Sequence, residues 1–125
     1  MSDFDPNEVM KRCLETNATG LMNVQGRSAI RDRHFRCQFS RQTAPPDGPI
    51  QTVEFDGIIK NITVIREETR RGTVAREFIR LSYQTEDIEF RRNFCIELSA
   101  NGKAFLVETA KGINSGKYEC EFRLQ

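Results

Sequence analysis

Alternation between apolar and polar residues is the feature that most limits how this chain can fold. In the C-terminal stretch 117–124, every second residue is apolar and each residue between them is charged. Successive side chains of a β-strand point to opposite faces, so this pattern buries one face and leaves the other in water. The chain is therefore predicted to end in a strand of an antiparallel sheet.

Most of the chain after residue 20 has the same character. Further strands are predicted over His34–Ser40, in two long runs between Thr52 and Tyr83, over Phe90–Leu98 and over Ala104–Thr109. The long runs join near Thr69–Gly72, and Asn101-Gly102 is a strong hairpin signal. A change of phase at Asp56-Gly57 predicts a β-bulge there. The proline-rich stretch Thr43–Pro49 is predicted to be a loop.

The start of the chain predicts one helix over residues 5–17. Asp5 suits the N-cap and Pro6 suits the first helical position, where a missing N–H costs least. Apolar residues follow at helical spacing, at 9, 10, 13 and 14, and Gly20 lies beyond the expected end. We expect this helix to pack on the sheet.

These elements predict a single domain, 1–125, made of the helix at 5–17 and an antiparallel β domain over 20–125. The fold class is mainly β (all-β or α+β), an antiparallel meander of about six or seven strands with one N-terminal helix. The meander closes either as a small barrel or as a sandwich, and the pattern alone does not choose between them.

The composition gives the protein no strong overall field. It has 19 basic and 18 acidic residues and a net charge of +1, which favours neither nucleic acid nor a membrane surface. The sequence shows no run long and apolar enough to span a bilayer, and no secretion signal. We therefore expect a cytoplasmic protein whose four cysteines, at 13, 37, 95 and 120, are free thiols.

The sequence offers little that suggests catalysis. His34 is the only histidine, and Cys37, three residues further along the same predicted strand, points to the opposite face. The two side chains therefore cannot pair locally as base and nucleophile. No nucleophile elbow, P-loop, dinucleotide fingerprint or zinc-binding spacing occurs. We expect no enzyme activity, no metal and no cofactor. An enzyme whose site is assembled from distant strands is kept as a further alternative.

A candidate ligand site precedes the first predicted strand. Arg27 and Arg31 form an R-x-x-x-R pattern there, and the sequence GIIKNIT follows later, at 57–63. This order resembles PilZ domains, small β-barrels that bind the bacterial second messenger cyclic di-GMP. In that family R-x-x-x-R precedes the first strand, and a [D/N]-x-S-x-x-G element follows after a comparable gap.

The PilZ resemblance implies that Arg27 and Arg31 clamp the phosphates and guanine, while Asn61 and Thr63 read the base. Arginine suits this role because its planar fork binds phosphate through two hydrogen bonds and stacks on a purine. The sequence departs from the family pattern at two places. Thr63 replaces the serine, and Arg66 occupies the position of the glycine that lets the backbone approach the ligand.

Two further groups of residues combine basic and aromatic or polar side chains. Arg76, Phe78 and Arg80 share one face of a predicted strand, and His34 and Arg36 share a face of another. An exposed Arg-Phe-Arg line is suited to stacking bases and holding phosphates of single-stranded nucleic acid. Alternatively, Phe78 belongs to the core and the arginines extend past it into water. Many neighbouring acidic residues count against nucleic acid.

The leading functional hypothesis is a non-catalytic β-rich binding or adaptor domain. Its partner is expected to be another protein or a second copy of the chain, since alternating charges on strand faces suit such a contact. A PilZ-like receptor for a cyclic dinucleotide is the first alternative, and a single-stranded nucleic-acid binder is the second.

Overall fold

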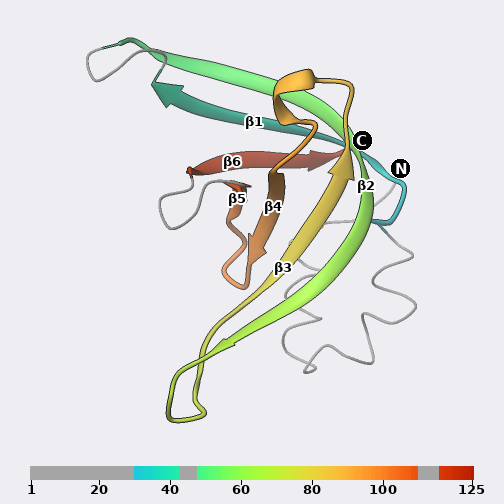
Figure 1. The fold of residues 1–125 in the computed structure, drawn as a ribbon. Coiled ribbons are helices and arrows are strands. Elements are labelled where there is room, and N and C mark those ends of the chain that lie inside the picture. Colours follow the sequence, from blue (N-terminus) through green and yellow to red (C-terminus); the bar gives the residue numbers. More distant parts are fainter. Residues whose placement is uncertain (1–29, 43–47, 110–115) are drawn as a thin grey trace.

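The computed structural model describes residues 30–42, 48–109 and 116–125, and the predicted helix at 5–17 lies outside this part of the chain. Within it, six antiparallel strands close in sequence order into one barrel (Figure 1). The strands are β1 His34–Gln42, β2 Ile50–Glu68, β3 Val74–Gln84, β4 Phe94–Ser99, β5 Ala104–Glu108 and β6 Lys117–Leu124. The prediction of a mainly β, antiparallel meander is confirmed, and the sheet closes on itself as a barrel.

The interior of the barrel is lined by the apolar residues of the period-two pattern. Phe35 is at its centre: its ring stacks on Phe122 at 5.3 Å between centroids and meets Phe55 and Tyr83 edge to face. The apolar side chains of the other strands complete this core. Each large apolar side chain that is fully buried contributes roughly 1.5–3 kcal/mol, so the alternation itself supplies most of the driving force for closure.

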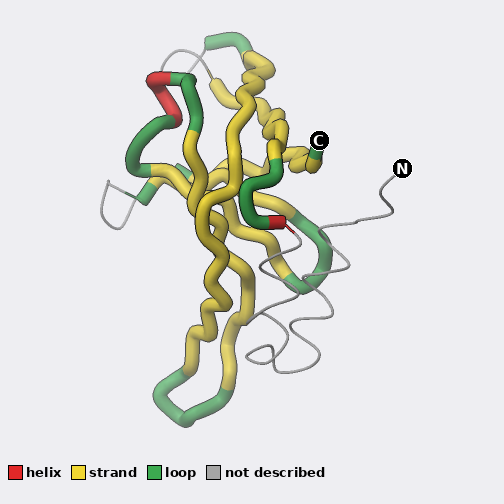
Figure 2. Tube along the Cα trace, turned by 90° about the vertical axis from the view of Figure 1, so that its right-hand side faces the viewer, coloured by secondary structure: helices red, strands yellow, loops and turns green. Residues whose placement is uncertain are grey.

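The hairpin of β2 and β3 extends beyond the barrel. The ladder between β1 and β2 covers only Ile50–Ile58, and the ladder between β3 and β4 covers only Phe78–Leu81. β2 and β3 continue to pair with each other as far as Glu68 and Val74. Figures 1 and 2 show this two-stranded extension, here called the ribbon, projecting from one end of the molecule.

The bulge lies elsewhere than the sequence predicts. The register between β1 and β2 runs without a break across Asp56 and Gly57, so the predicted bulge there is wrong. The register with β3 shifts instead at two places, between Ile59 and Asn61 and between Glu67 and Glu68, and the first shift leaves Lys60 as the extra residue. The glycine at 57 serves close packing, because a Cβ there would lie 2.8 Å from both the Phe35 ring and the backbone oxygen of Gln84.

The predicted strand over Phe90–Leu98 is also shorter than expected. Its first residue, Phe90, ends a 3₁₀ turn, η1 (Ile88–Phe90), and β4 begins only at Phe94. The cause is local, since the carboxylate of Asp87 accepts a hydrogen bond from the N–H of Glu89 and so caps the turn. Phe90 still enters the core, where its ring stacks on Phe55 at 4.6 Å.

The described residues include no helix that is both long enough and apolar enough to cross a membrane.

Candidate functional site

The last residues of the arginine-bearing segment form a fixed turn. Ile30 anchors it in the core with only 3% of its surface exposed. Its carbonyl oxygen accepts a hydrogen bond from the N–H of Arg33, and Asp32 has a φ of +64°, the left-handed conformation. Asp tolerates this conformation better than most residues because its short side chain can bond locally. Arg31 lies on the exposed side of this turn.

This turn is attached to the edge of β2 by three contacts. The N–H of Asp32 donates to the carbonyl of Ile59 at 2.8 Å, and the N–H of Ile59 donates to the carbonyl of Arg33 at 3.0 Å. The ammonium of Lys60 lies 3.1 Å from the carboxylate of Asp32. The segment that carries Arg31 is therefore held beside the bulge of β2. β-bulges occur frequently next to binding sites, where they redirect side chains.

The two β2 residues implied by the PilZ resemblance follow directly after the bulge. Asn61 and Thr63 are both exposed. The side-chain oxygen of Asn61 accepts a hydrogen bond from the N–H of Ile62 at 2.9 Å. The structure thus places Arg31 on a segment joined to β2 two residues before Asn61, whereas Arg27 lies outside the described residues.

Arg66 stands where the PilZ pattern has glycine. Its guanidinium lies 3.5 Å from the carboxylate of Glu77 on β3, and its side chain is 43% exposed. A long side chain at this position fills space that a glycine would leave to a ligand. This is the main structural departure from the family pattern.

The Arg-Phe-Arg line on β3 is not an exposed stacking surface. Phe78 points away from the core cluster, yet it is only 2% exposed. The guanidinium of Arg76 lies 3.9 Å from the centre of its ring, and that of Arg80 lies at 5.7 Å. Cation–π contacts therefore cover the ring on the outer wall of the barrel, and a base has no access to it.

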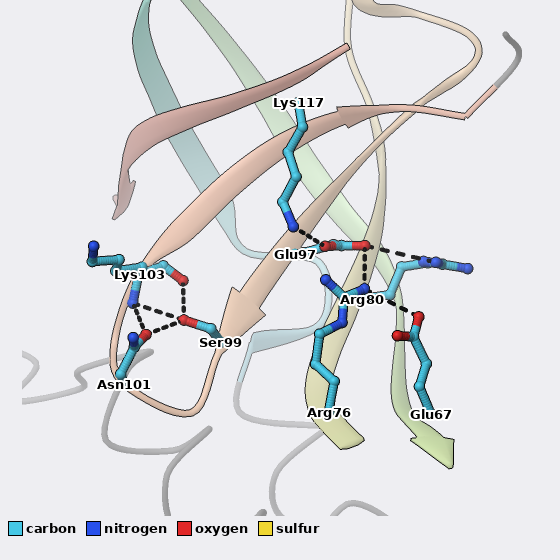
Figure 3. Close-up of polar contacts among 8 residues, drawn as sticks. All are labelled: Glu67, Arg76, Arg80, Glu97, Ser99, Asn101, Lys103 and Lys117. Atoms are coloured by element: carbon cyan, nitrogen blue, oxygen red, sulfur yellow. Dashed lines mark hydrogen bonds and ion pairs between the residues drawn. The ribbon is translucent and has the colours of Figure 1, made fainter. Parts of the chain in front are cut away.

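A buried carboxylate organises the same wall, as Figure 3 shows. Glu97 is 5% exposed, and its oxygens lie 3.6 Å from Arg76, 3.8 Å from Arg80 and 3.6 Å from Lys117. A buried carboxylate needs such partners, because its desolvation is costly. Lys117 also lies 4.6 Å from the ring centre of Phe105. The period-two pattern of the predicted strand Phe90–Leu98 assigns Glu97 to the polar outer face, and no local signal distinguishes it from an exposed residue.

The second predicted basic pair, His34 and Arg36, faces acidic neighbours. Arg36 donates to both carboxylate oxygens of Asp56, at 2.8 and 3.4 Å, and lies 3.3 Å from Glu54. The hydrogen bond from Arg36 lowers the pKa of Asp56, and the same hydrogen bond raises the pKa of Arg36. His34 lines a cavity of about 530 Å³ together with Glu54, Asp56, Glu86 and Asp87. This region is locally acidic and does not attract phosphate.

The thiols inside the barrel are arranged for packing. Cys37 is fully buried, and its contact with Cys120 and its burial both raise its thiol pKa. Burial also raises the pKa of the Cys95 thiol. Buried thiols with raised pKa values are poor nucleophiles. Across residues 30–42, 48–109 and 116–125, no group of three or more potential ligand side chains lies close enough to hold a metal ion.

A scan of protein-family models and searches of curated proteins and of solved structures found no match to this chain.

Proposed function

We propose that this chain is a non-catalytic binding domain whose ligand is a cyclic dinucleotide, held as in PilZ domains. The observation that carries the proposal is the attachment of the segment Ile30–Arg33 to Ile59 of β2. It brings Arg31, the described end of the R-x-x-x-R element, to the strand edge on which Asn61 and Thr63 follow. The closed antiparallel barrel agrees with the fold that the resemblance implies.

The charges in the region around Arg31 and Asn61 suit a dianionic ligand. Arg31 and Lys60 supply positive charge at the surface, and Asp32 neutralises only part of it through its 3.1 Å contact with Lys60. Arg27 adds a second guanidinium in the sequence, and paired guanidinium groups bind phosphate through two hydrogen bonds each. The side chain of Arg66 narrows the site, so we expect weaker binding than a glycine at this position would allow. We also propose that the protein is cytoplasmic.

Calorimetric titration with cyclic di-GMP tests this proposal. We expect saturable binding to the wild type and its loss in Arg27→Ala/Arg31→Ala. The matched control is Arg70→Ala/Arg71→Ala, which removes the same charge from exposed residues at the tip of the ribbon and should bind like the wild type. Absence of heat with the wild type contradicts the ligand assignment, and equal binding by the Arg27/Arg31 variant contradicts the site.

A protein partner or a second copy of the chain is the other candidate, and the ribbon is the observation that favours it. An isolated two-stranded hairpin is marginally stable in water, so a long one projecting from a barrel contributes little to the core. Val74–Glu77 of β3 lies beyond the ladder with β4, and strand edges of this kind accept another strand. The alternating charges of the ribbon favour a specific contact over aggregation.

Sedimentation velocity at several protein concentrations tests self-association through the ribbon. The test variant replaces residues 68–75 with Asn-Gly, which reconnects the cross-strand partners Glu67 and Arg76 through a two-residue turn. We expect the wild type to associate and this shortened variant to be monomeric. Arg27→Ala/Arg31→Ala, which leaves the ribbon unchanged, is the full-length control and should associate like the wild type. A wild type that stays monomeric at about 100 µM, where contacts worth ~5.5 kcal/mol are populated, contradicts self-association.

The nucleic-acid alternative draws no support from the outer wall of the barrel, because Phe78 is covered and Arg76, Arg80 and Lys117 contact Glu97.

A further inference from the structure

The barrel is open along part of the contact between β1 and β6. Their ladder joins Phe35–Phe39 to Cys120–Leu124 and ends there, although β1 continues to Gln42 and β6 begins at Lys117. On their other sides the two strands remain paired, β1 with β2 and β6 with β5. The two strands therefore separate at this end of the ladder, and we call the gap between them the split.

A groove of about 710 Å³ occupies the split. Phe39, Tyr118 and Cys120 form its apolar floor, and the rings of Phe39 and Tyr118 lie 5.3 Å apart. These side chains belong to the period-two set that faces the barrel interior. Tyr118 and Cys120 are nevertheless half-exposed, whereas Leu106 on the adjoining β5 is fully buried. Phe122 and Leu124, which lie in the ladder with β1, are half-exposed as well, so the core face of β6 is only partly covered along the strand. At the split this partly covered face lines the groove through Tyr118 and Cys120.

The backbone on both sides of the groove is oriented for strand pairing. The N–H of Glu108 donates to the carbonyl of Gly116, and in this register the backbone groups of Lys117 and Glu119 point away from β5 and into the split. On the opposite side, the N–H of Ile59 donates to the carbonyl of Arg33, and the same alternation directs the backbone of Ser40 into the split. Ser40 and Glu119 are the next pair in register, but the ladder does not include them.

The charges at the rim indicate the partner. Glu119 and Glu121 face outward from β6 beside the groove, with 63% and 52% of their side chains exposed. Glu119 lies 3.9 Å from Lys103 and Glu121 contacts Arg123, but both carboxylates remain more than half exposed. Lys117, the cation among the lining residues, lies 3.6 Å from Glu97. The β1 side contributes the neutral residues Gln38 and Ser40. An extended peptide with apolar residues on one face and basic residues on the other matches both the floor and the rim.

We propose that the split is a docking site for an extended segment of a partner protein, which adds as a short strand along Lys117 and Glu119 of β6. Its apolar side chains enter the groove above Phe39 and Tyr118, and its basic side chains meet Glu119 and Glu121. Strand addition of this kind takes affinity from main-chain hydrogen bonds and specificity from alternate side chains. This site is separate from both the proposed cyclic-dinucleotide site around Arg31 and the ribbon.

The test uses a fluorescently labelled heptapeptide in which lysine alternates with valine, phenylalanine and valine. We expect saturable binding to the full chain and none of the same peptide with glutamate in place of lysine. The decisive variant is Glu119→Pro, which lacks the N–H that points into the split but leaves the ladder to β5 intact. It should bind at least about tenfold more weakly, the loss expected for a strand hydrogen bond and its unsatisfied partner.

Glu119→Ala is the matched control, because it loses the charge but keeps the N–H, and its affinity should fall by only about threefold. Ser40→Trp blocks the groove from the β1 side without touching β6 and should also abolish binding. Hydrogen exchange should show that the peptide slows exchange at the amides of Lys117 and Glu119. Equal binding by Glu119→Pro and Glu119→Ala, equal binding of the acidic peptide, or unchanged exchange at these amides overturns the proposal.

Discussion

The ammonium of Lys60 lies 3.1 Å from the carboxylate of Asp32, and this contact joins the turn before β1 to the bulge of β2. Asp32 combines it with a positive φ of 64° and a backbone hydrogen bond to Ile59. Asp32 thus makes two of the three contacts that hold the segment carrying Arg31 against the strand that carries Asn61. The proposed cyclic-dinucleotide site depends on this geometry.

Substitutions at Asp32 should separate the backbone requirement from the ion pair. We expect Asp32→Gly to change the free energy of unfolding by less than ~1 kcal/mol, because glycine adopts positive φ freely and an exposed ion pair contributes little. Asp32→Val should destabilise by about 1–2 kcal/mol, since a β-branched residue is strained in the left-handed region. Urea denaturation measures both, and equal losses contradict this assignment.

Gly57 should resist substitution because of its packing, although its φ is not in the left-handed region. A Cβ there would lie 2.8 Å from the Phe35 ring and from the backbone oxygen of Gln84. We expect Gly57→Ala to lower the free energy of unfolding by about 1–3 kcal/mol. In the background of Phe35→Leu, the added cost of Gly57→Ala should shrink, and an unchanged cost in the double variant assigns the effect to Gln84 alone.

Glu97 should stabilise the outer wall by holding three cations together. Replacing it with glutamine removes the carboxylate that Arg76, Arg80 and Lys117 share, although Arg76 keeps its contact with Glu67 at 3.2 Å, and we expect a loss of about 1–3 kcal/mol. The loss should be smaller in high salt, which screens the repulsion. Glu119→Gln, at a largely exposed site 3.9 Å from Lys103, is the control and should cost less than ~0.5 kcal/mol. Chemical denaturation at two salt concentrations measures these differences.

Acid should weaken the pairing of Asp56 with Arg36. The pKa of Asp56 is lower in the folded protein than its ordinary value of 3.8, chiefly because Arg36 donates hydrogen bonds to it. Its contribution to stability is therefore complete above the ordinary pKa and is lost as the pH falls through the lower folded pKa. Thermal unfolding followed across this acid range should show a smaller drop for Asp56→Asn than for the wild type. Identical pH profiles contradict the assignment.

The thiols of Cys37 and Cys95 should react slowly with alkylating reagents in the folded protein. Their raised pKa values leave little thiolate at neutral pH, and both side chains are buried. We expect each to be labelled only after unfolding, as measured by peptide mapping after timed alkylation. Rapid labelling of Cys37 under native conditions indicates that the split opens into the core more widely than its floor suggests.

Much of the wall of the barrel could be predicted from sequence because period two is a local property. The run Lys117–Leu124 fulfils the prediction residue by residue, as does the wet-face and core-face division of β1. The structure departs from the predicted strands where a side chain or a backbone group of a neighbouring segment makes a competing hydrogen bond. Asp87 caps a turn and shortens the predicted strand at Phe90, and the bulge lies at Lys60, where the turn before β1 meets β2.

The sequence by itself determined the antiparallel strands, their order and the side that each turns to the core, because alternation and turn residues act over a few neighbours. Only the tertiary structure decided that the sheet closes as a barrel rather than a sandwich, that Glu97 and Phe78 are buried on the outside of it, and that β1 and β6 separate after Phe39. These features depend on contacts between residues far apart in the chain. Local periodicity carries no information about such contacts.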